Sequence, residues 1–372
     1  MTYQFIQQQH EFDHVLHLME HHQCYGLDTE FIKVDSLWPK LGVFQINVAE
    51  QIYLLDGTQL NFEKFWPKLF AAKQNIFHAC GEDIDLIYHY AQCRGLNNVF
   101  DTQVALAFLG YGLQVSYQNA LKQILNIDID KDQTRSDWLA RPLSQEQLNY
   151  AANDVIYLNQ LAQQLQQQLT QKQLLHCVLE DCQHLTQEIA ASTPDALLYT
   201  DVGNYRHSRR QLMQIQQLTQ WREKMAKQYN VPRSFILKNN VILELVDQFP
   251  KTPAQLIQIK NIRMSVVREH AKTILNLLKQ LPEPEQWPQR LAKPPRLSAH
   301  LAEQVEAILA RVTRYSGIPK EVLMRKKWLN AIAYAATHPE AEAQLPAYLL
   351  GWRYHDLTEP LLKLFAQSST EV

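Results

Sequence analysis

The sequence lacks the signals of an exported, membrane-spanning or disulfide-bonded protein. Its N-terminus has neither the basic segment nor the apolar core of a signal peptide, and no apolar run approaches the roughly 20 residues that span a bilayer. We therefore expect a cytoplasmic protein with no membrane association. Cysteine is scarce, and we expect free thiols because its five positions fit neither a disulfide framework nor a zinc site: Cys24, Cys80, Cys93, Cys177 and Cys182.

The sequence also lacks the phosphate-binding loop Gly-x-x-x-x-Gly-Lys-Ser/Thr. This absence excludes a helicase motor, and we expect no nucleotide cofactor. The length of 372 residues predicts two or three domains with substantial cores. The hydrophobic fraction of 46% and the charged fraction of 20% are those of an ordinary globular protein.

Charge is distributed unevenly, although the formal net charge is only −2. Lys and Arg number 11 against 22 Asp and Glu in residues 1–190, a balance of −11. They number 17 against 6 in residues 206–296, a balance of +11, and eight of each sign occur in residues 297–372. An acidic front beside a basic middle fits a metal-using catalytic domain joined to a polyanion-binding module. On these counts alone, a solvated basic helical surface fits equally well.

Four acidic residues and one tyrosine in three separate segments indicate the chemistry. Asp28 and Glu30 lie inside an apolar run, Asp83 closes a second segment, and Tyr150 and Asp154 lie four apart in a third. Carboxylates gathered in one cleft repel one another unless cations neutralise them. Hard divalent ions bind such oxygen ligands, and paired Mg²⁺ or Mn²⁺ ions cleave phosphodiesters in line. The pattern therefore predicts a metal-dependent nuclease.

Up to about residue 125 the pattern predicts a mixture of strands and helices. The expected strands cover residues 24–34, 42–49, 51–56, 75–79 and 99–101. Asp28 and Glu30 are two apart in the first strand, so both side chains project from one face. Ser144 begins a helix with a capping box and leucines at helical spacing as far as residue 165. Tyr150 and Asp154 share a face of that helix.

Beyond residue 190 the sequence predicts a linker and then only helices. Two stretches repeat weakly: Asn230–Leu237 parallels Gly317–Met324, and Ile259–Arg263 parallels Leu350–Arg353. A proline-rich segment separates the two copies. We therefore expect two related small helical domains and three domains in all, at residues 1–190, 206–285 and 296–372.

The acidic segments resemble the motifs of the DEDD superfamily of 3′→5′ exonucleases. The spacing of Tyr150 and Asp154 is similar to its tyrosine-type branch, since the histidine-type branch would place histidine where this chain has Asn149. Within this branch nearly the whole chain resembles the ribonuclease D family. The similar segments are Asp28–Phe31, Trp38–Gly42, His78–Asp83, Asp101–Gln103 and Asp137–Leu143. The helical repeats resemble HRDC domains, which bind nucleic acids, and ribonuclease D typically carries two.

The resemblance implies an α/β ribonuclease H-like exonuclease domain, with a mixed sheet flanked by helices, followed by two all-α HRDC-like domains. It also implies that Asp28 bridges two divalent cations, Mg²⁺ or Mn²⁺, that Glu30 and Asp154 complete one site, and that Asp83 helps to anchor the other. These ions would activate a water and neutralise the leaving 3′ oxygen. Tyr150 would orient that water, because an ordinary tyrosine pKa of about 10 makes it a poor general base.

Several residues beside these motifs have more than one interpretation. Glu82 and Asp85 are expected to be solvated, and His78 is expected to be a hydrogen-bonded structural residue. Asp101 either supports the metal site from behind or ends a strand. Residues 134–138 with Arg141 either contact the 3′ strand or anchor the last catalytic helix.

The first helical repeat supplies most of the basic charge. We expect its Lys and Arg side chains to follow a phosphate backbone, which positions a substrate without reading its sequence. The candidates are Arg209, Arg210, Arg222, Lys224, Lys227, Arg233, Lys238, Lys260, Arg263, Arg268 and Lys272. The second repeat is charge-balanced, and we expect it to brace the molecule rather than to hold RNA.

We predict a monomeric, metal-dependent 3′→5′ exoribonuclease that acts on RNA with a free 3′ end and releases nucleoside 5′-monophosphates. The resemblance alone adds tRNA precursors and other structured RNAs as substrates. Two alternatives stay open, namely a DNA exonuclease with the same chemistry and a non-catalytic RNA-binding scaffold. Comparing the cleavage of a 3′-tailed RNA with that of its DNA counterpart distinguishes the exoribonuclease from the DNA exonuclease. Mononucleotide release that stops in chelator distinguishes the enzyme from the non-catalytic scaffold.

Overall fold

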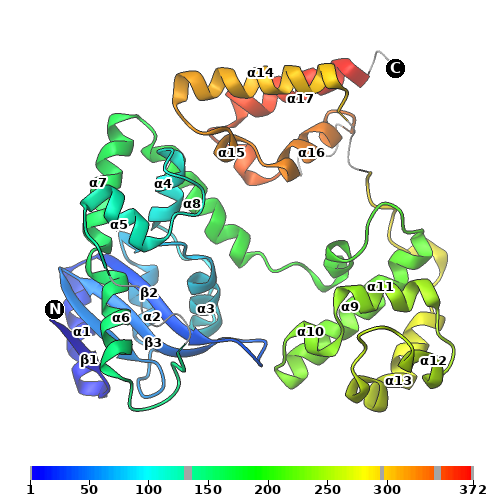
Figure 1. Cartoon of the computed structure of the whole chain (residues 1–372), viewed down its shortest axis with the longest axis horizontal. Helices are drawn as coiled ribbons and strands as arrows, with labels where there is room; N and C mark the ends of the chain where they lie inside the picture. The colour runs from blue at the N-terminus through cyan, green and yellow to red at the C-terminus, as the bar shows by residue number, and fades with distance from the viewer. Residues whose placement is uncertain (1, 130–135, 294–296, 339–344, 370–372) are drawn as a thin grey trace. The chain divides into compact units, whose positions relative to one another are not determined.

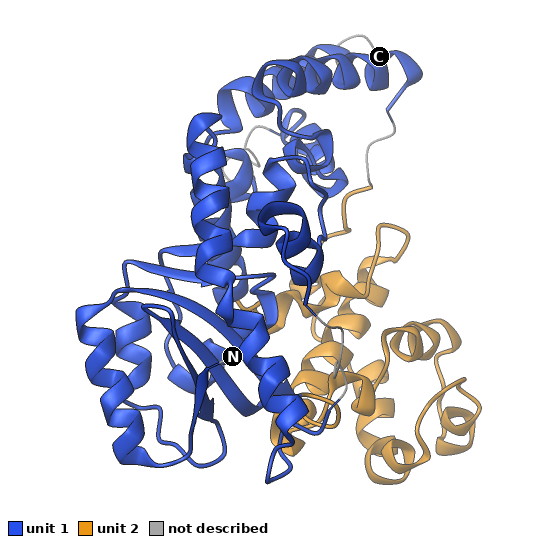
Figure 2. Cartoon of the chain, turned by 60° about the vertical axis from the view of Figure 1, so that its left-hand side comes forward, with its two compact units in different colours: residues 1–32, 40–191, 295–372 blue, residues 33–39, 192–294 orange. Residues whose placement is uncertain are grey.

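The computed structural model describes residues 2–129, 136–293, 297–338 and 345–369. The chain forms two compact units (Figure 2): residues 1–32, 40–191 and 295–372 make the first, and residues 33–39 and 192–294 make the second. The division into domains at 1–190, 206–285 and 296–372 stays a prediction. No helix within the described ranges has both the length and the apolar character needed to cross a membrane.

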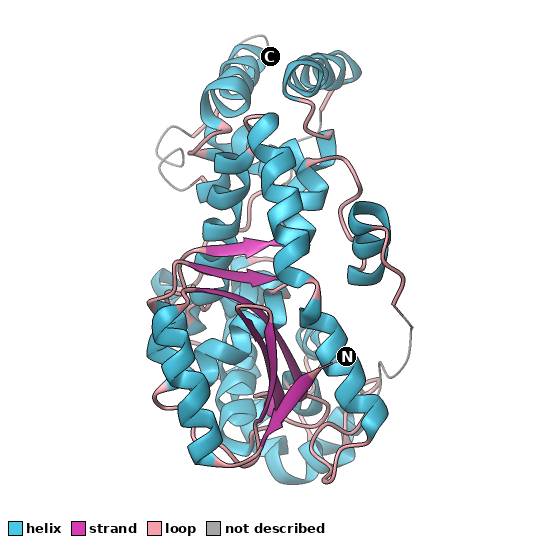
Figure 3. Cartoon of the chain, turned by 90° about the vertical axis from the view of Figure 1, so that its left-hand side faces the viewer, coloured by secondary structure: helices cyan, strands magenta, loops and turns pink. Residues whose placement is uncertain are grey.

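A six-stranded mixed sheet organises the first unit (Figures 1 and 3). Its strand order is β1-β4-β3-β2-β5-β6, and β3 runs antiparallel to both of its neighbours while the other pairs are parallel. The strands are β1 (Tyr3–Ile6), β2 (Cys24–Ile32), β3 (Lys40–Val48), β4 (Gln51–Asp56), β5 (Gln74–Phe77) and β6 (Val99–Asp101). The bounds predicted for β4 and β6 are confirmed, and those of β2, β3 and β5 were wrong by one or two residues. The short edge strand β1 was not predicted.

Helices cover both faces of the sheet. Leu27 and Phe44 face a core formed with α1 (Gln9–His21), α2 (Phe65–Phe70) and α3 (Gly81–Ala91). Val43 and Leu54 face a second core. Its helices are α4 (Thr102–Phe108), α5 (Tyr117–Leu125), α6 (Gln145–Ile156), α7 (Leu158–Gln171) and α8 (Leu175–Ala190). Because strand side chains alternate between faces, Asp28 lies on the α6 side, opposite to Leu27.

The capping box at Ser144 is confirmed, because its side chain accepts from Gln147 N–H and the Gln147 side chain accepts from Ser144 N–H. The single long helix predicted from this cap was wrong. Tyr157, at φ −102° and ψ 1°, separates α6 from α7. Apolar spacing continues through this break, which explains why periodicity alone could not locate it.

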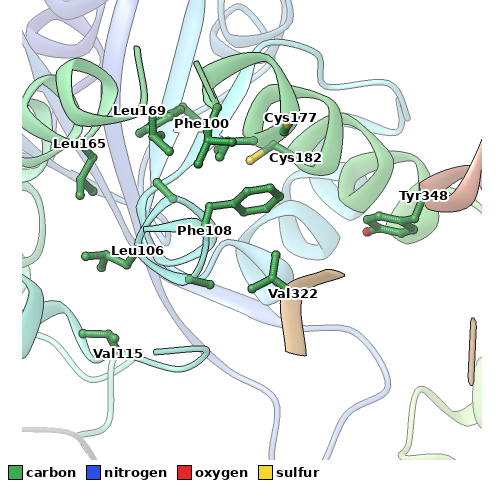
Figure 4. Packing of buried hydrophobic residues seen from close by; sticks show 14 of the residues in the cluster. Phe100, Leu106, Phe108, Val115, Leu165, Leu169, Cys177, Cys182, Val322 and Tyr348 are labelled. Carbon is green, nitrogen blue, oxygen red and sulfur yellow. The ribbon is translucent and has the colours of Figure 1, made fainter. Parts of the chain in front are cut away.

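The C-terminal helices pack against α4 and α8 of the same unit. They are α14 (Ala299–Ser316), α15 (Lys320–Leu323), α16 (Lys326–Ala335) and α17 (Glu359–Ser369), with short turns η4 (Ala347–Leu349) and η5 (Tyr354–Thr358). Figure 4 shows Phe108 of α4 close to Val322, and Tyr348 lies in the same cluster of buried side chains.

A buried ion pair joins the C-terminal helices to α8. Arg353 and Asp181 are 1% and 6% exposed, and the guanidinium donates to both carboxylate oxygens at 2.6 and 2.8 Å. Trp352 Nε1 also donates to Asp181, at 3.0 Å. The C-terminal segment is thus built into the first unit through polar as well as apolar contacts.

The described residues of the second unit form helices and loops. Its helices are η1 (Asp195–Asp201), α9 (Arg209–Tyr229), α10 (Arg233–Ile236), α11 (Asn239–Gln248), α12 (Pro253–Ile257), α13 (Met264–Lys279) and η2 (Pro284–Gln286). Leu37, from the segment between β2 and β3, is buried in the core of this unit. The backbone N–H of Trp38 donates to Asn230 Oδ1 at 3.2 Å. The segment 33–39 therefore packs as part of the helical unit.

Candidate active site

Three of the predicted ligands come together between the sheet and α6. Asp28 and Glu30 share one face of β2, and Asp154 lies in the last turns of α6. Carboxylate oxygens from these three residues all lie within 4.8 Å of one another. Strand alternation places Asp28 and Glu30 on one face, and the packing of α6 on the sheet brings Asp154 to them.

The position of α6 is fixed by contacts with the sheet. Asn47 of β3 donates from Nδ2 to the Val155 and Ile156 carbonyl oxygens, at 2.9 and 3.3 Å. Arg141, just before α6, donates to both oxygens of the fully buried Asp56 carboxylate, at 2.6 and 2.7 Å. Of the two interpretations of Arg141, its contacts therefore match anchoring of the last catalytic helix.

Asp83 lies near this group but outside it. It is 7% exposed in the first turn of α3, and Thr29 Oγ1 donates to its Oδ1. Thr29 lies between Asp28 and Glu30 in β2, so its side chain points to the opposite face of the sheet. The two-residue period of a strand could have predicted this orientation. The sequence analysis chose Asp83 over its neighbour Glu82 as the functional acid. In the structure Asp83 is buried and Glu82 is exposed.

Asp101 supports the turn that leads to Asp83. Its side chain is 1% exposed and accepts from the N–H groups of Ala79 and Cys80 at 3.1 and 2.9 Å. The same carboxylate caps α4 by accepting from Gln103 N–H at 2.8 Å. Ala79 has φ +64°, a left-handed conformation that is unfavourable for alanine. Asp101 therefore stabilises a strained turn immediately before α3, in addition to ending β6.

The four carboxyls are shifted toward their protonated forms. Burial, followed by the charges of Asp83 and Asp154, raises the pKa of Asp28 well above its usual range. Burial and the charge of Asp154 raise the pKa of Glu30 to about 9. Burial and the charge of Asp83 raise the pKa of Asp154 to about 7, and burial raises the pKa of Asp83 to about 6.

The donor chemistry of this group fits divalent cations. Four hard oxygen ligands are crowded together, and among the described residues the charges that shift the pKa values of Asp28, Glu30 and Asp154 are other carboxylates. A bound cation would reverse this repulsion and favour the ionised forms.

His78 is the hydrogen-bonded structural residue that the sequence analysis expected, and the role of Tyr150 stays a prediction. Burial and the charge of Asp154 raise the pKa of the Tyr150 phenol, which makes proton abstraction by this group still less favourable. Both ring nitrogens of His78 are occupied, with Nδ1 2.8 Å from Thr102 Oγ1 and Nε2 2.9 Å from the Val115 carbonyl oxygen. Burial lowers the pKa of His78, so this residue fits a neutral structural role.

The predicted nucleic-acid ligands in the second unit divide into two groups. Arg222 is a correction, because its side chain is 7% exposed and donates to Leu237 O and Asn239 Oδ1 at 3.1 and 2.6 Å. Arg233 pairs with the buried carboxylate of Glu223, and Arg209 donates to three backbone carbonyls of residues 284–288. Arg233 is itself exposed despite this pairing. The other exposed members are Arg210, Lys224, Lys227, Lys238, Lys260, Arg263, Arg268 and Lys272.

Two family models and several curated relatives match this chain. A model described as 3′-5′ exonuclease matches residues 3–170, and one described as HRDC domain matches residues 211–278. Ribonuclease D of Pseudomonas paraeruginosa is 31% identical over 344 residues, covering 91% of this chain and 90% of that protein. Ribonuclease D of a Shewanella species is 29% identical over 344 residues, covering 91% and 88%.

Solved structures show the same fold. The crystal structure of Escherichia coli RNase D, described as an exoribonuclease involved in structured RNA processing, has a TM-score of 0.90 at 24% identity and covers 99% of both chains. The catalytic core of RRP6 from Trypanosoma brucei has a TM-score of 0.57 at 18% identity, covering 74% of this chain and 78% of that one. The family model matches one HRDC domain, and the second HRDC-like domain stays a prediction.

Proposed function

Because the chain belongs to the ribonuclease D family, and is therefore a 3′→5′ exoribonuclease of a divalent-metal-dependent class, we propose that Asp28, Glu30, Asp83 and Asp154 hold two divalent cations, Mg²⁺ or Mn²⁺. The observation that carries this proposal is the meeting of the Asp28, Glu30 and Asp154 oxygens within 4.8 Å. When bound, such cations supply a hydroxide at neutral pH and neutralise charge on the leaving 3′ oxygen.

The protein's own residues divide the remaining work. Asp28 has Asp83, Asp154 and Glu30 around it, and this central place supports its role as the ligand shared by both cations. Glu30 and Asp154 complete one site, and Asp83, held by Thr29, contributes to the other. Tyr150 orients the attacking water through its phenol, because its raised pKa keeps it protonated at neutral pH.

We propose tRNA precursors and other structured RNAs with a free 3′ end as substrates, cleaved in the cytoplasm by a monomer. The description of the Escherichia coli relative as an enzyme of structured RNA processing supports this choice. The products would be nucleoside 5′-monophosphates, since the 3′ oxygen of the preceding nucleotide is the leaving group.

A basic pocket on the second unit gives this substrate a place to bind. The pocket has a volume of about 700 Å³ and lies between the end of α11 and one side of α13. Its lining includes the apolar side chains of Phe249 and Leu275, one acid, Glu269, and four cations: Lys251, Arg268, Lys272 and Lys279. Ammonium and guanidinium groups beside apolar side chains fit a single strand, whose phosphates meet the cations and whose bases meet the apolar groups.

The test is cleavage of a tRNA precursor with a short 3′ extension, with and without Mg²⁺ or Mn²⁺. We expect stepwise release of nucleoside 5′-monophosphates that stops in chelator, and loss of turnover in Asp28→Asn with its fold retained. A DNA strand of the same sequence serves as the control substrate. Near-normal cleavage by folded Asp28→Asn would contradict the metal assignment, and equal cleavage of the DNA strand would contradict the choice of RNA.

A further inference from the structure

Gln45, in the middle of β3, has a completely buried side chain that makes no hydrogen bonds. Its exposure is 0%, and neither Nε2 nor Oε1 has a partner among the residues that the structure describes. Buried amides are normally hydrogen-bonded, because an unpartnered donor or acceptor loses its interaction with water without replacement. An exception beside a functional site needs an explanation.

The strand register places Gln45 directly opposite Asp28. Within the β2–β3 pair, Asp28 faces Gln45 and Gly26 faces Asn47. Residues opposite each other in antiparallel strands project from the same face, with Cβ atoms about 4.5–5.5 Å apart. Gln45 therefore lies on the same face of the sheet as Asp28, the face that α6 covers with Asp154.

The other neighbours of Gln45 within the sheet offer its amide no free partner. Leu54 stands opposite on β4, and Val43 precedes it on its own strand. Asn47 follows it, but the Asn47 amide already donates to α6 and accepts from Glu50 N–H. Along β2, Gly26 has no side chain. The polar groups that share this face of β2 with the Gln45 amide are thus the carboxylates of Asp28 and Glu30.

We propose that Gln45 is a positioning residue for Asp28, and that its Nε2 donates a hydrogen bond to the Asp28 carboxylate once divalent cations hold that carboxylate ionised. This inference rests on the proposed function. The hydrogen bond fixes the rotamer of the shared ligand. A residue behind a metal ligand that orients it in this way typically affects metal affinity by about 10- to 100-fold.

The test is Gln45→Met, which keeps the length of the side chain and removes the amide. We expect Mn²⁺ affinity, measured by calorimetry or by the free-Mn²⁺ paramagnetic resonance signal, to fall about 10- to 100-fold. The thermal midpoint without metal should stay the same or rise, because an unpartnered buried amide is replaced by an apolar group of similar shape. For RNA cleavage, kcat at fixed metal should fall while KM for RNA stays unchanged.

Asn159→Leu is the matched control. Its Oδ1 is also buried without a partner among the described residues, but it lies over Gly26, 2.6 Å from where a Cβ would stand. This variant should leave Mn²⁺ affinity unchanged, because Asn159 lies over Gly26 and not opposite Asp28.

Unchanged Mn²⁺ affinity in Gln45→Met, with binding lost in Asp28→Asn, would overturn the role of Gln45 and leave the proposed function intact. A wild-type protein that binds no Mn²⁺ would overturn both. If Gln45→Met does not fold, Gln45→Leu provides the same comparison, and the same outcomes apply to it.

Discussion

Breaking the ion pair between Arg353 and Asp181 should destabilise the first unit more than any surface change. In Arg353→Met the Asp181 carboxylate stays buried and loses both guanidinium donors, at 2.6 and 2.8 Å, keeping only Trp352 Nε1 at 3.0 Å. The carbonyls of Leu323 and Val322 also lose their arginine donors, at 3.1 and 2.8 Å. Removing one partner of a buried pair typically costs about 3–5 kcal/mol, and we expect a free energy of unfolding lower by that amount.

Urea unfolding of the full chain, followed by tryptophan fluorescence, measures the change. The double variant Arg353→Met with Asp181→Leu removes both charges and should cost less than either single change, because no buried charge is left without its partner. Lys327→Met is the matched control, since Lys327 and Glu188 also join the C-terminal segment to α8, at 3.2 Å, but are 60% and 52% exposed.

The control should change the free energy of unfolding by about 1 kcal/mol at most, as exposed ion pairs do. If Arg353→Met also changes the free energy of unfolding by no more than the control does, the buried pair does not hold the C-terminal segment on α8, and the reasoning from burial is wrong. A double variant worse than both single variants would also contradict it.

Three further outcomes follow from the site and its charges. Tyr150→Phe should lower kcat by about 10²- to 10³-fold, the usual effect of losing one aligned donor. Asp154→Asn should in addition lower the affinity for Mn²⁺ in a titration. Equal Mn²⁺ affinity in Asp154→Asn and wild type would contradict the role of Asp154 as a ligand. Without metal, the folded pKa of Asp154 is raised to about 7, so the folded state binds more protons than the unfolded state between about pH 4 and 7, and stability falls as the pH rises through that window. Asp154→Asn should therefore raise the thermal midpoint in chelator at pH 8 but not at pH 4, and an equal effect at both values would refute the shift. Lys251→Ala and Lys272→Ala should each reduce the slope of log RNA affinity against log salt by about 0.7–0.9, and an unchanged slope would exclude the basic pocket as the RNA-binding surface.

The sequence predicted the features of the nuclease that depend on local spacing. Strand period placed Asp28 and Glu30 on one face, helix period placed Tyr150 beside Asp154, and the capping box fixed the start of α6. Each of these follows from residues a few positions apart, for which backbone geometry allows one arrangement.

Features that depend on distant contacts could not be predicted in this way. Arg222 is typical of an exposed basic helix by composition, yet it donates inward to Leu237 and Asn239. Asp101 has two possible roles in the sequence, and only its hydrogen bonds to Ala79 and Cys80 show that it supports the turn before α3. The sequence also does not show that the Gln45 amide is buried without hydrogen bonds. Its place opposite Asp28 depends on the register of β2 and β3.

The segment 33–39 has a consequence for how this protein can be divided. The chain leaves the first unit directly after β2, contributes Leu37 and Trp38 to the helical unit, and returns at β3. The helical unit is therefore discontinuous in sequence. One of its segments, residues 33–39, connects β2, which carries Asp28, to β3, which carries Gln45. A recombinant fragment that ends near residue 191 keeps this segment but loses the core that buries Leu37, so it gains an exposed apolar loop and is prone to aggregation. Replacing Leu37 and Trp38 with polar residues would be the first step in making an isolated nuclease fragment.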